Sequence, residues 1–229
     1  HAHGIPEDFP EAVIEECETL APPKMDGRVD LRDMPLLTID PMDARDHDDA
    51  VYAEPDTNEN NKGGWSVIVA IADVAHYIRP GTKLDREAEL RGNSVYFPDR
   101  VVPMLPEKIS NDLCSLREGE ERPCLAVKMI FDKNGEKVSQ RFMRAMMKSA
   151  AKLSYQEAQA AIDGTVSDTY LFLIDPTLKP LSVHFAEVRA GGASLTQRDQ
   201  HDRHSRPCTD LQALAAVGRP FQWRDGEAA

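Results

Sequence analysis

The pattern of hydrophobic positions along the chain predicts a β-sheet with helices around it. Leu36–Asp40 predicts a buried strand that ends at an acid, and Ala50–Ala53 predicts a second short strand. Trp65–Ile78 begins as a run rich in β-branched residues, which is typical of a strand in the centre of a sheet. An Asn-Gly pair between Cys124–Asp132 and Glu136–Met147 tolerates the positive φ angles of a tight turn, so these two runs predict a β-hairpin.

Helical patterns occupy several of the segments between the predicted strands. Four segments show a pattern typical of helices: 6–23, Thr82–Arg91, Pro106–Leu113 and Ser154–Asp163. Thr82 is a candidate N-cap, and Ser154 precedes Glu157 by three residues, the spacing of a capping box. Val95–Phe97 predicts one more short strand. Because strands and helices alternate without a regular βαβ rhythm, we expect an α/β (α+β) fold, with an irregular mixed β-sheet and surrounding helices.

Changes in composition divide the chain into three parts. Residues 1–33 predict a lead-in helix and a polar connector, residues 34–182 the main domain, and residues 183–229 an atypical tail. The tail has six Arg but no Ile and no Lys, and only Leu211–Val217 shows apolar helical spacing. A poorly packed tail and an out-of-frame translation are both compatible with this pattern. The chain has no initiator Met, so we expect it to be a fragment or a processed product.

The overall composition excludes several classes of protein. The chain has 229 residues, of which 41% are hydrophobic and 29% charged, which is typical of a globular protein. No run approaches the ~20 apolar residues of a membrane span, so we expect no membrane partner. Four widely spaced cysteines fit neither a zinc site nor a disulfide framework, so we expect reduced thiols and a cytoplasmic location. A net charge of −12 argues against a simple phosphate-binding surface.

The acidic residues are concentrated in one short segment, TIDPMDARDHDDAV (38–51), which follows a predicted strand. It holds five aspartates, at positions 40, 43, 46, 48 and 49. Two carboxylates ~4 Å apart repel each other by ~4 kcal/mol at an effective dielectric constant of 20. Either the loop spreads its acids into water, or a hard divalent cation such as Mg²⁺ lies between them. In an extended segment Asp46 and Asp48 would share one face, with Asp49 on the other.

Two other sites built on acidic residues fit the segment poorly. An EF-hand loop counted from Asp46 would need an acid or amide where Ala50 stands, and its glycine is missing. An aspartyl phosphotransferase would need an acid two residues after Asp40, where the sequence has Met42. We interpret His47 as a spacer or surface residue, because no second His or Cys lies at metal-ligand spacing.

Several long motifs together resemble one enzyme family. They are TIDPMDARDHDDAV, GGWSVIVAIADVAHYIRPGTKLDREAELRGNSVYFPDRVVPMLPEKISNDLCSL and RPCLAVKMIF. In this order they resemble the first half of the RNB catalytic domain of the ribonuclease II/ribonuclease R family, with the ribonuclease R branch closer. The resemblance covers about residues 1–181, and residues 34–182 would be the N-terminal part of that domain.

The resemblance implies a 3′→5′ exoribonuclease that hydrolyses single-stranded RNA from its 3′ end to nucleoside 5′-monophosphates with Mg²⁺. Matched position by position, the metal-binding aspartates of the family fall on Asp40, Asp46, Asp48 and Asp49. The chemical step would depend most on Asp48. Tyr96 resembles the aromatic that stacks on a base near the RNA 3′ end, although its pattern alone favours a core residue. Asp43 is assigned to the surface.

Several other residues are open to either an RNA contact or an ordinary structural role. Arg79, Arg91 and Arg100 are candidates for contacts with RNA phosphates or, equally, for salt bridges. Trp65 and Phe97 are assigned to the core. The motifs that would follow in the family, including a catalytic arginine and a second stacking aromatic, do not match the tail. We therefore expect no processive degradation by this chain, and the alternative function is a non-catalytic fragment that binds metal or RNA. Protein partners are unknown.

Overall fold

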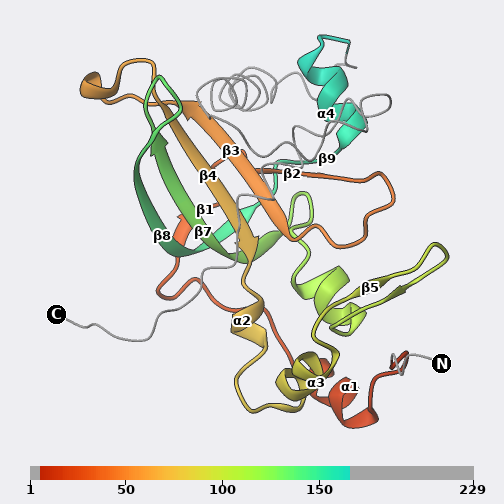
Figure 1. Ribbon diagram of the computed structural model, residues 1–229. Helices are drawn as coiled ribbons and strands as arrows, with labels where there is room; N and C mark the ends of the chain where they lie inside the picture. The colour runs from red at the N-terminus through yellow and green to blue at the C-terminus, as the bar shows by residue number, and fades with distance from the viewer. Residues whose placement is uncertain (1–5, 166–229) are drawn as a thin grey trace.

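A mixed seven-stranded sheet forms the centre of the molecule in the computed structural model, which describes residues 6–165 (Figure 1). The sheet has the order β1-β8-β7-β4-β3-β2-β9, and β5 and β6 form a separate two-stranded ribbon. The strands are β1 (Val29–Leu31), β2 (Leu37–Asp40), β3 (Asp49–Pro55), β4 (Trp65–Ala72), β5 (Val95–Tyr96), β6 (Val101–Val102), β7 (Glu121–Phe131), β8 (Lys137–Lys148) and β9 (Ala151–Ser154). The helices are α1 (Glu11–Glu18), α2 (Val74–Tyr77), α3 (Lys83–Arg91), α4 (Tyr155–Ile162), the 3₁₀ turn η1 (Glu59–Asn61) and the π-helical turn η2 (Lys108–Leu113).

The predicted fold class is confirmed, because the sheet joins parallel and antiparallel pairs. β1 runs parallel to β8 and β2 parallel to β9, while β3, β4, β7 and β8 form an antiparallel block. β4 is the fourth of the seven strands, as expected for the most apolar run of the chain. Most of its side chains are buried, which a strand covered on both faces requires.

The hairpin turn and the two helix caps predicted from the sequence are confirmed. β7 and β8 form the predicted hairpin, and Gly135 at its turn has a φ of 80°. Thr82 caps α3 by accepting a hydrogen bond from the Asp85 amide at 3.2 Å. The capping box at the start of α4 is complete, because the amide of Glu157 donates to Ser154 and the Ser154 amide donates to the Glu157 carboxylate.

Three expectations about individual elements are wrong. The helix expected over residues 6–23 is limited to α1, since Pro10 precedes its first turn and two prolines stand beyond its end. The expected polar connector contains β1, whose three residues are too few to show a period. The segment expected as an ordinary helix ends in η2, where the Cys114 amide donates to the carbonyl five residues back.

The two faces of the central strands belong to two different buried clusters. α1, α3 and η2 add Val13, Leu84 and Ile109 to one buried cluster, which lies on small sheet residues. α4 adds Ala158 and Ala161 to a second cluster on β2, β3, β4 and β9. Trp65, assigned to the core, packs partly buried against this second cluster. The expected tail, with Leu211–Val217, lies outside the described residues.

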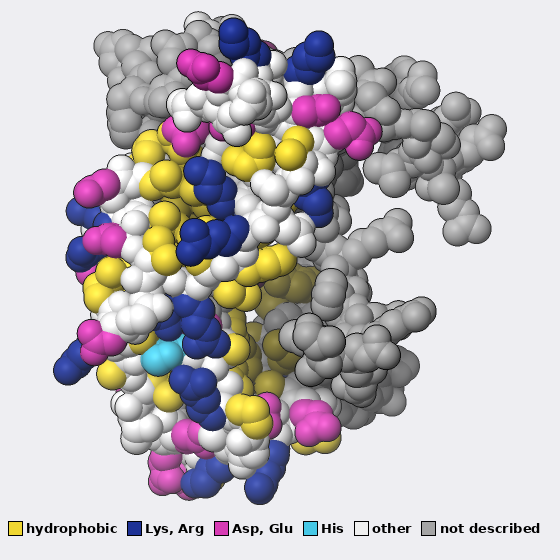
Figure 2. All heavy atoms as spheres, turned by 90° about the vertical axis from the view of Figure 1, so that its left-hand side faces the viewer, with side chains coloured by type: hydrophobic (Ala, Val, Ile, Leu, Met, Phe, Trp, Pro, Cys, Tyr) yellow, Lys and Arg dark blue, Asp and Glu magenta, His cyan; other side chains and the backbone are white. Residues whose placement is uncertain are grey.

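The surface carries a mixture of basic and hydrophobic side chains on the side where β8 lies in Figure 1. Figure 2 shows Lys and Arg side chains gathered there beside hydrophobic ones. Leu125, Val138 and Phe142 of β7 and β8 are among the exposed hydrophobic residues. Within residues 6–165 no helix combines the length and apolar character needed to cross a bilayer.

A buried ion pair attaches the segment before β1 to the rest of the sheet. The Arg28 Nη2 atom lies 2.7 Å from Asp73 Oδ2, and the two side chains are 5% and 3% exposed. Arg28 also donates to the Ala145 carbonyl of β8, and Arg144 lies 3.7 Å from the same carboxylate. Asp73, which interrupts the longest apolar run of the sequence, is therefore neutralised inside the fold.

Removing one partner of this pair leaves a buried charge without compensation, which costs about 3–5 kcal/mol. We expect Arg28→Met to lower the free energy of unfolding by this amount in urea titrations followed by circular dichroism. Arg32→Met is the matched control, because Arg32 pairs with Asp30 and Glu121 on the surface and its loss should change little. Equal effects of the two substitutions would contradict the importance of the buried pair.

Candidate active site

The acidic segment connects two neighbouring antiparallel strands. Asp40 is the last residue of β2, and Asp49 is the first residue of β3. The register pairs Leu37 with Val51, so the two strands leave and re-enter the sheet at the same end. Both aspartates therefore stand at one edge of the sheet, and residues 41–48 form the loop between them. The apolar residues of β2 and β3, which precede and follow the acids, place the two ends of the loop in the sheet.

Residues 46–48 alternate between solvent and the interior. Asp46 and Asp48 are exposed, whereas His47 between them is only 4% exposed. This alternation is the one expected for an extended segment with both acids on one face. Asp49, which follows, is half-buried at the start of β3.

The carboxylates of this loop influence one another strongly. Burial raises the pKa of Asp49 to about 6, and the charges of Asp48 and Asp40 contribute to the rise. Burial also raises the pKa of Asp48, and the charges of Asp46 and Asp40 raise it further. Asp48 keeps exposed surface, but enough protein surrounds its carboxyl group to remove part of its hydration. Like charges thus accumulate in one place, as they do where proteins bind cations.

Asp40 is the most buried member of the group, at 8% exposure. Burial raises its pKa, the hydrogen bond from His47 opposes the rise, and the charge of Asp46 adds to it. The His47 Nδ1 atom lies 2.7 Å from Asp40 Oδ2. The interpretation of His47 as a spacer or surface residue is therefore wrong, because its ring is buried against Asp40. Spacing rules for metal ligands contain no signal for this contact.

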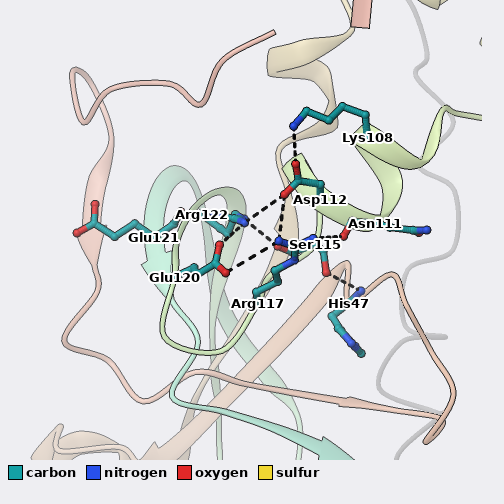
Figure 3. Close-up of polar contacts among 9 residues, drawn as sticks. All are labelled: His47, Lys108, Asn111, Asp112, Ser115, Arg117, Glu120, Glu121 and Arg122. Carbon is teal, nitrogen blue, oxygen red and sulfur yellow. Dashed lines mark hydrogen bonds and ion pairs between the residues drawn. The ribbon is translucent and has the colours of Figure 1, made fainter. Parts of the chain in front are cut away.

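The backbone of the loop is held by a distant segment (Figure 3). The Leu116 amide donates to the His47 carbonyl at 2.6 Å, and the His47 amide donates to Ser115 Oγ at 3.3 Å. The Ser115 carbonyl in turn accepts from Arg122 Nε at 3.0 Å. The Arg122 guanidinium forms an ion pair with Glu120. This network holds the loop in place although it carries three aspartates and lies between two more, Asp40 and Asp49.

The aspartates fit Mg²⁺ by their chemistry, although they do not form a closed ligand set. Carboxylate oxygens are the donors that Mg²⁺ prefers, and their shared repulsion is what a cation relieves. In the described part of the chain, no three His, Cys, Asp or Glu side chains come close enough together to hold a metal ion. Mg²⁺ usually keeps several waters and binds only one or two carboxylates with a substrate phosphate, so an open arrangement is compatible with it.

Tyr96 lies beside the acidic loop although it is far away in sequence. Burial raises the pKa of its hydroxyl group, and the charges of Asp46 and Asp48 raise it further. The residue is nevertheless 69% exposed, so the alternative interpretation as a core aromatic is wrong. β5, which carries Tyr96, belongs to the small ribbon with β6. An exposed ring next to carboxylates is suited to stacking, and its role in RNA binding stays a prediction.

The arginines considered for RNA contacts are mostly engaged elsewhere. The side chain of Arg91 is only 2% exposed: it pairs with Glu87, donates to three backbone carbonyls and lies 3.7 Å over the ring of Phe9. Arg100 pairs with acids on the surface and lies over the ring of Phe97, which is half-buried. Arg79 is exposed.

Neutralising one acid should relieve the repulsion among the others. The charge of Asp46 raises the pKa values of Asp40, Asp48 and Tyr96, whereas Asp43 is an exposed residue earlier in the same loop. We expect Asp46→Asn to raise the urea midpoint at pH 8 in EDTA, where the carboxylates are ionised. The gain should shrink as the pH falls and the carboxylates become protonated. Asp43→Asn is the control, and an equal gain from it would show that the effect is general surface charge.

Comparison with known proteins identifies the domain. Residues 28–198 match the model of the RNB domain. Ribonuclease R of Vibrio parahaemolyticus is 43% identical over 192 residues, which is 82% of this chain. Ribonuclease R of Escherichia coli is 47% identical over 166 residues, which is 71% of this chain. The chain spans only about a fifth of the length of these two curated relatives, 22% of the first and 20% of the second.

Solved structures agree with this match. RNase R of Mycoplasma genitalium in complex with ribose methylated single-stranded RNA has a TM-score of 0.75 and 28% identity, covering 81% of this chain and 29% of that one. The Dss1 exoribonuclease mutant from Candida glabrata, at 18% identity and a TM-score of 0.64, shares the fold. The mixed sheet, its acidic edge and the sequence match lead to one conclusion: this chain belongs to the RNB domain family, and its relatives are ribonucleases R.

Proposed function

We propose that this chain carries the acidic, metal-binding part of an exoribonuclease that shortens single-stranded RNA from its 3′ end and releases nucleoside 5′-monophosphates. The observation that carries the proposal is the placement of four aspartates: Asp40 and Asp49 stand at the paired ends of β2 and β3, and Asp46 and Asp48 are exposed on the loop between them. Membership of the RNB family supports the reaction class. Relatives from M. genitalium have been solved with single-stranded and double-stranded RNA, which supports RNA as the substrate class.

Asp40, Asp46, Asp48 and Asp49 would hold Mg²⁺. The bound cation would supply charge stabilisation at the phosphate and a more acidic water molecule. The four aspartates would hold the cation from two kinds of position, strand ends and the loop between them. Asp40 and Asp49 stand at the ends of strands and provide fixed carboxylates, whereas Asp46 and Asp48 project from the loop toward the solvent side, where a phosphodiester can approach. We assign to Asp48 the largest effect on the chemical step.

Tyr96 would hold the base next to the 3′ end. A flat exposed ring stacks on any base, which suits an enzyme that does not select sequence. The acids beside it would repel the RNA backbone unless a cation were bound. Binding of RNA and binding of Mg²⁺ should therefore support each other at this site.

A non-catalytic fragment that binds metal or RNA is the second candidate. The catalytic arginine implied by the family resemblance belongs to later motifs, which the tail of this chain does not match. The cytoplasmic location and the three-part division at residues 33 and 182 stay predictions.

The activity test uses the purified 229-residue chain with 5′-labelled single-stranded RNA and Mg²⁺. We expect a slow, distributive ladder that shortens from the 3′ end, disappears in EDTA and is lost in Asp48→Asn. Asp43 is an exposed acid of the same loop, and Asp43→Asn should keep the wild-type rate. Folded protein that binds RNA or metal but leaves the label at full length would contradict the proposal and establish the second candidate.

The role of Tyr96 can be measured separately from cleavage, in the Asp48→Asn background. Stacking on one base contributes about 1–3 kcal/mol, so Tyr96→Ala should weaken binding of a fluorescein-labelled oligonucleotide by about 5- to 150-fold. Tyr96→Phe keeps the ring and should bind like the parent. Phe142→Ala removes an aromatic that is 64% exposed on β8 and is the matched control in the anisotropy titration. Equal losses from the two alanine substitutions would argue against a specific role for Tyr96.

A further inference from the structure

We propose that His47 is a positioning residue that fixes one metal-binding carboxylate, that of Asp40, and that Ser115 and Leu116 fix His47 in turn. This inference rests on the proposed function, because it concerns how the site is prepared for a cation. The structure supports it through three contacts: one between side chains and two with the backbone of His47.

The side-chain contact is short and shielded from water. The Nδ1 atom of His47 lies 2.7 Å from Oδ2 of Asp40, and the two side chains are 6% and 11% exposed. In the described part of the chain, Oδ2 is the only carboxylate oxygen of Asp40 that takes part in a hydrogen bond. Oδ1 is therefore available to another partner. Nδ1–H is present in one neutral tautomer of imidazole and in the cation, so the contact needs no change of protonation.

The backbone contacts leave the imidazole ring little freedom. Leu116 donates its amide to the His47 carbonyl at 2.6 Å, and the His47 amide donates to Ser115 Oγ. Ser115 and Leu116 are 0% and 1% exposed, so they form a rigid support. Figure 3 shows the His47 backbone facing Ser115. With both of its backbone polar groups bound, the main chain of His47 is fixed, and burial of the side chain, which is 6% exposed, limits the directions open to its ring.

The consequence for Asp40 is loss of rotation. A carboxylate at the end of a strand can turn about its side-chain bonds, and a cation that binds it must stop that motion. A hydrogen bond from a supporting residue stops it in advance and orients the free oxygen, and loss of such a partner typically costs 10–100-fold in metal affinity. The buried position of His47 also keeps Asp46 and Asp48 turned outward on either side of it.

Two substitutions separate positioning from packing. His47→Asn places an amide N–H close to the position of Nδ1 but leaves a cavity, whereas His47→Phe keeps a buried ring without a donor. Mn²⁺ binding to the 229-residue chain, measured by electron paramagnetic resonance, is the readout for the site. Urea unfolding is the readout for packing. The control is Asp40→Asn, which removes the ligand itself.

We expect His47→Phe to bind Mn²⁺ about 10–100-fold more weakly than wild type, and His47→Asn to bind within about threefold. The urea midpoint should show the opposite order: His47→Asn should lower it more than His47→Phe, because the Asn variant loses the packing contacts of the ring. A merely structural role predicts instead that Mn²⁺ affinity follows the urea midpoint in both variants, and this result would overturn the inference.

The outcomes distinguish this inference from the function on which it rests. If wild type binds Mn²⁺, Asp40→Asn loses the ion and His47→Phe binds like wild type, only the positioning role is overturned. If wild type binds no Mn²⁺, or Asp40→Asn binds it equally well, Asp40 is no ligand, and the positioning role falls together with the metal site.

Discussion

Repulsion between carboxylates is the constraint on which the candidate site depends. Asp40 and Asp49 are brought to one edge of the sheet by the pairing of β2 with β3, and the loop between them adds Asp46 and Asp48. Burial and like charge raise the pKa values of three of these acids, so the fold must hold them against their own charge. It does so with a strand on each side of the loop and with two hydrogen bonds to the His47 backbone: the His47 amide donates to Ser115 Oγ, and the Leu116 amide donates to the His47 carbonyl.

The scaffold beneath this edge explains how the repulsion is tolerated. β4 lies in the centre of the sheet and pairs with β3 along seven residue pairs, which fixes the strand that begins at Asp49. Helices contribute residues to the buried clusters on both faces of the sheet, and the Arg28–Asp73 pair attaches the residue before β1 to the same core. Two of the four aspartates, Asp40 and Asp49, thus stand on strand ends, and the loop that carries Asp46 and Asp48 is held between these strands.

Position in the fold separates residues that looked equivalent in the sequence. Arg91 was a candidate for RNA contacts, but it is buried because its guanidinium satisfies the carbonyls of Pro6, Asp8 and Pro103. Tyr96 looked like a core aromatic by pattern, yet it is exposed next to the acids. His47 looked like a surface spacer, yet it is buried against Asp40. In each case the deciding contact involves partners that local spacing does not reveal.

The amino-acid sequence by itself determined the elements whose causes are local. These are the central strand, the Asn-Gly hairpin, the caps at Thr82 and Ser154, the acidic segment and the family to which its motifs belong. Backbone propensity and neighbouring side chains are sufficient for them. Only the tertiary structure decided that β1 joins β8, that Ser115 supports His47 from 68 residues away, and that Tyr96 lies beside the acids. Such contacts depend on packing between distant segments, and no periodicity in a single segment encodes them.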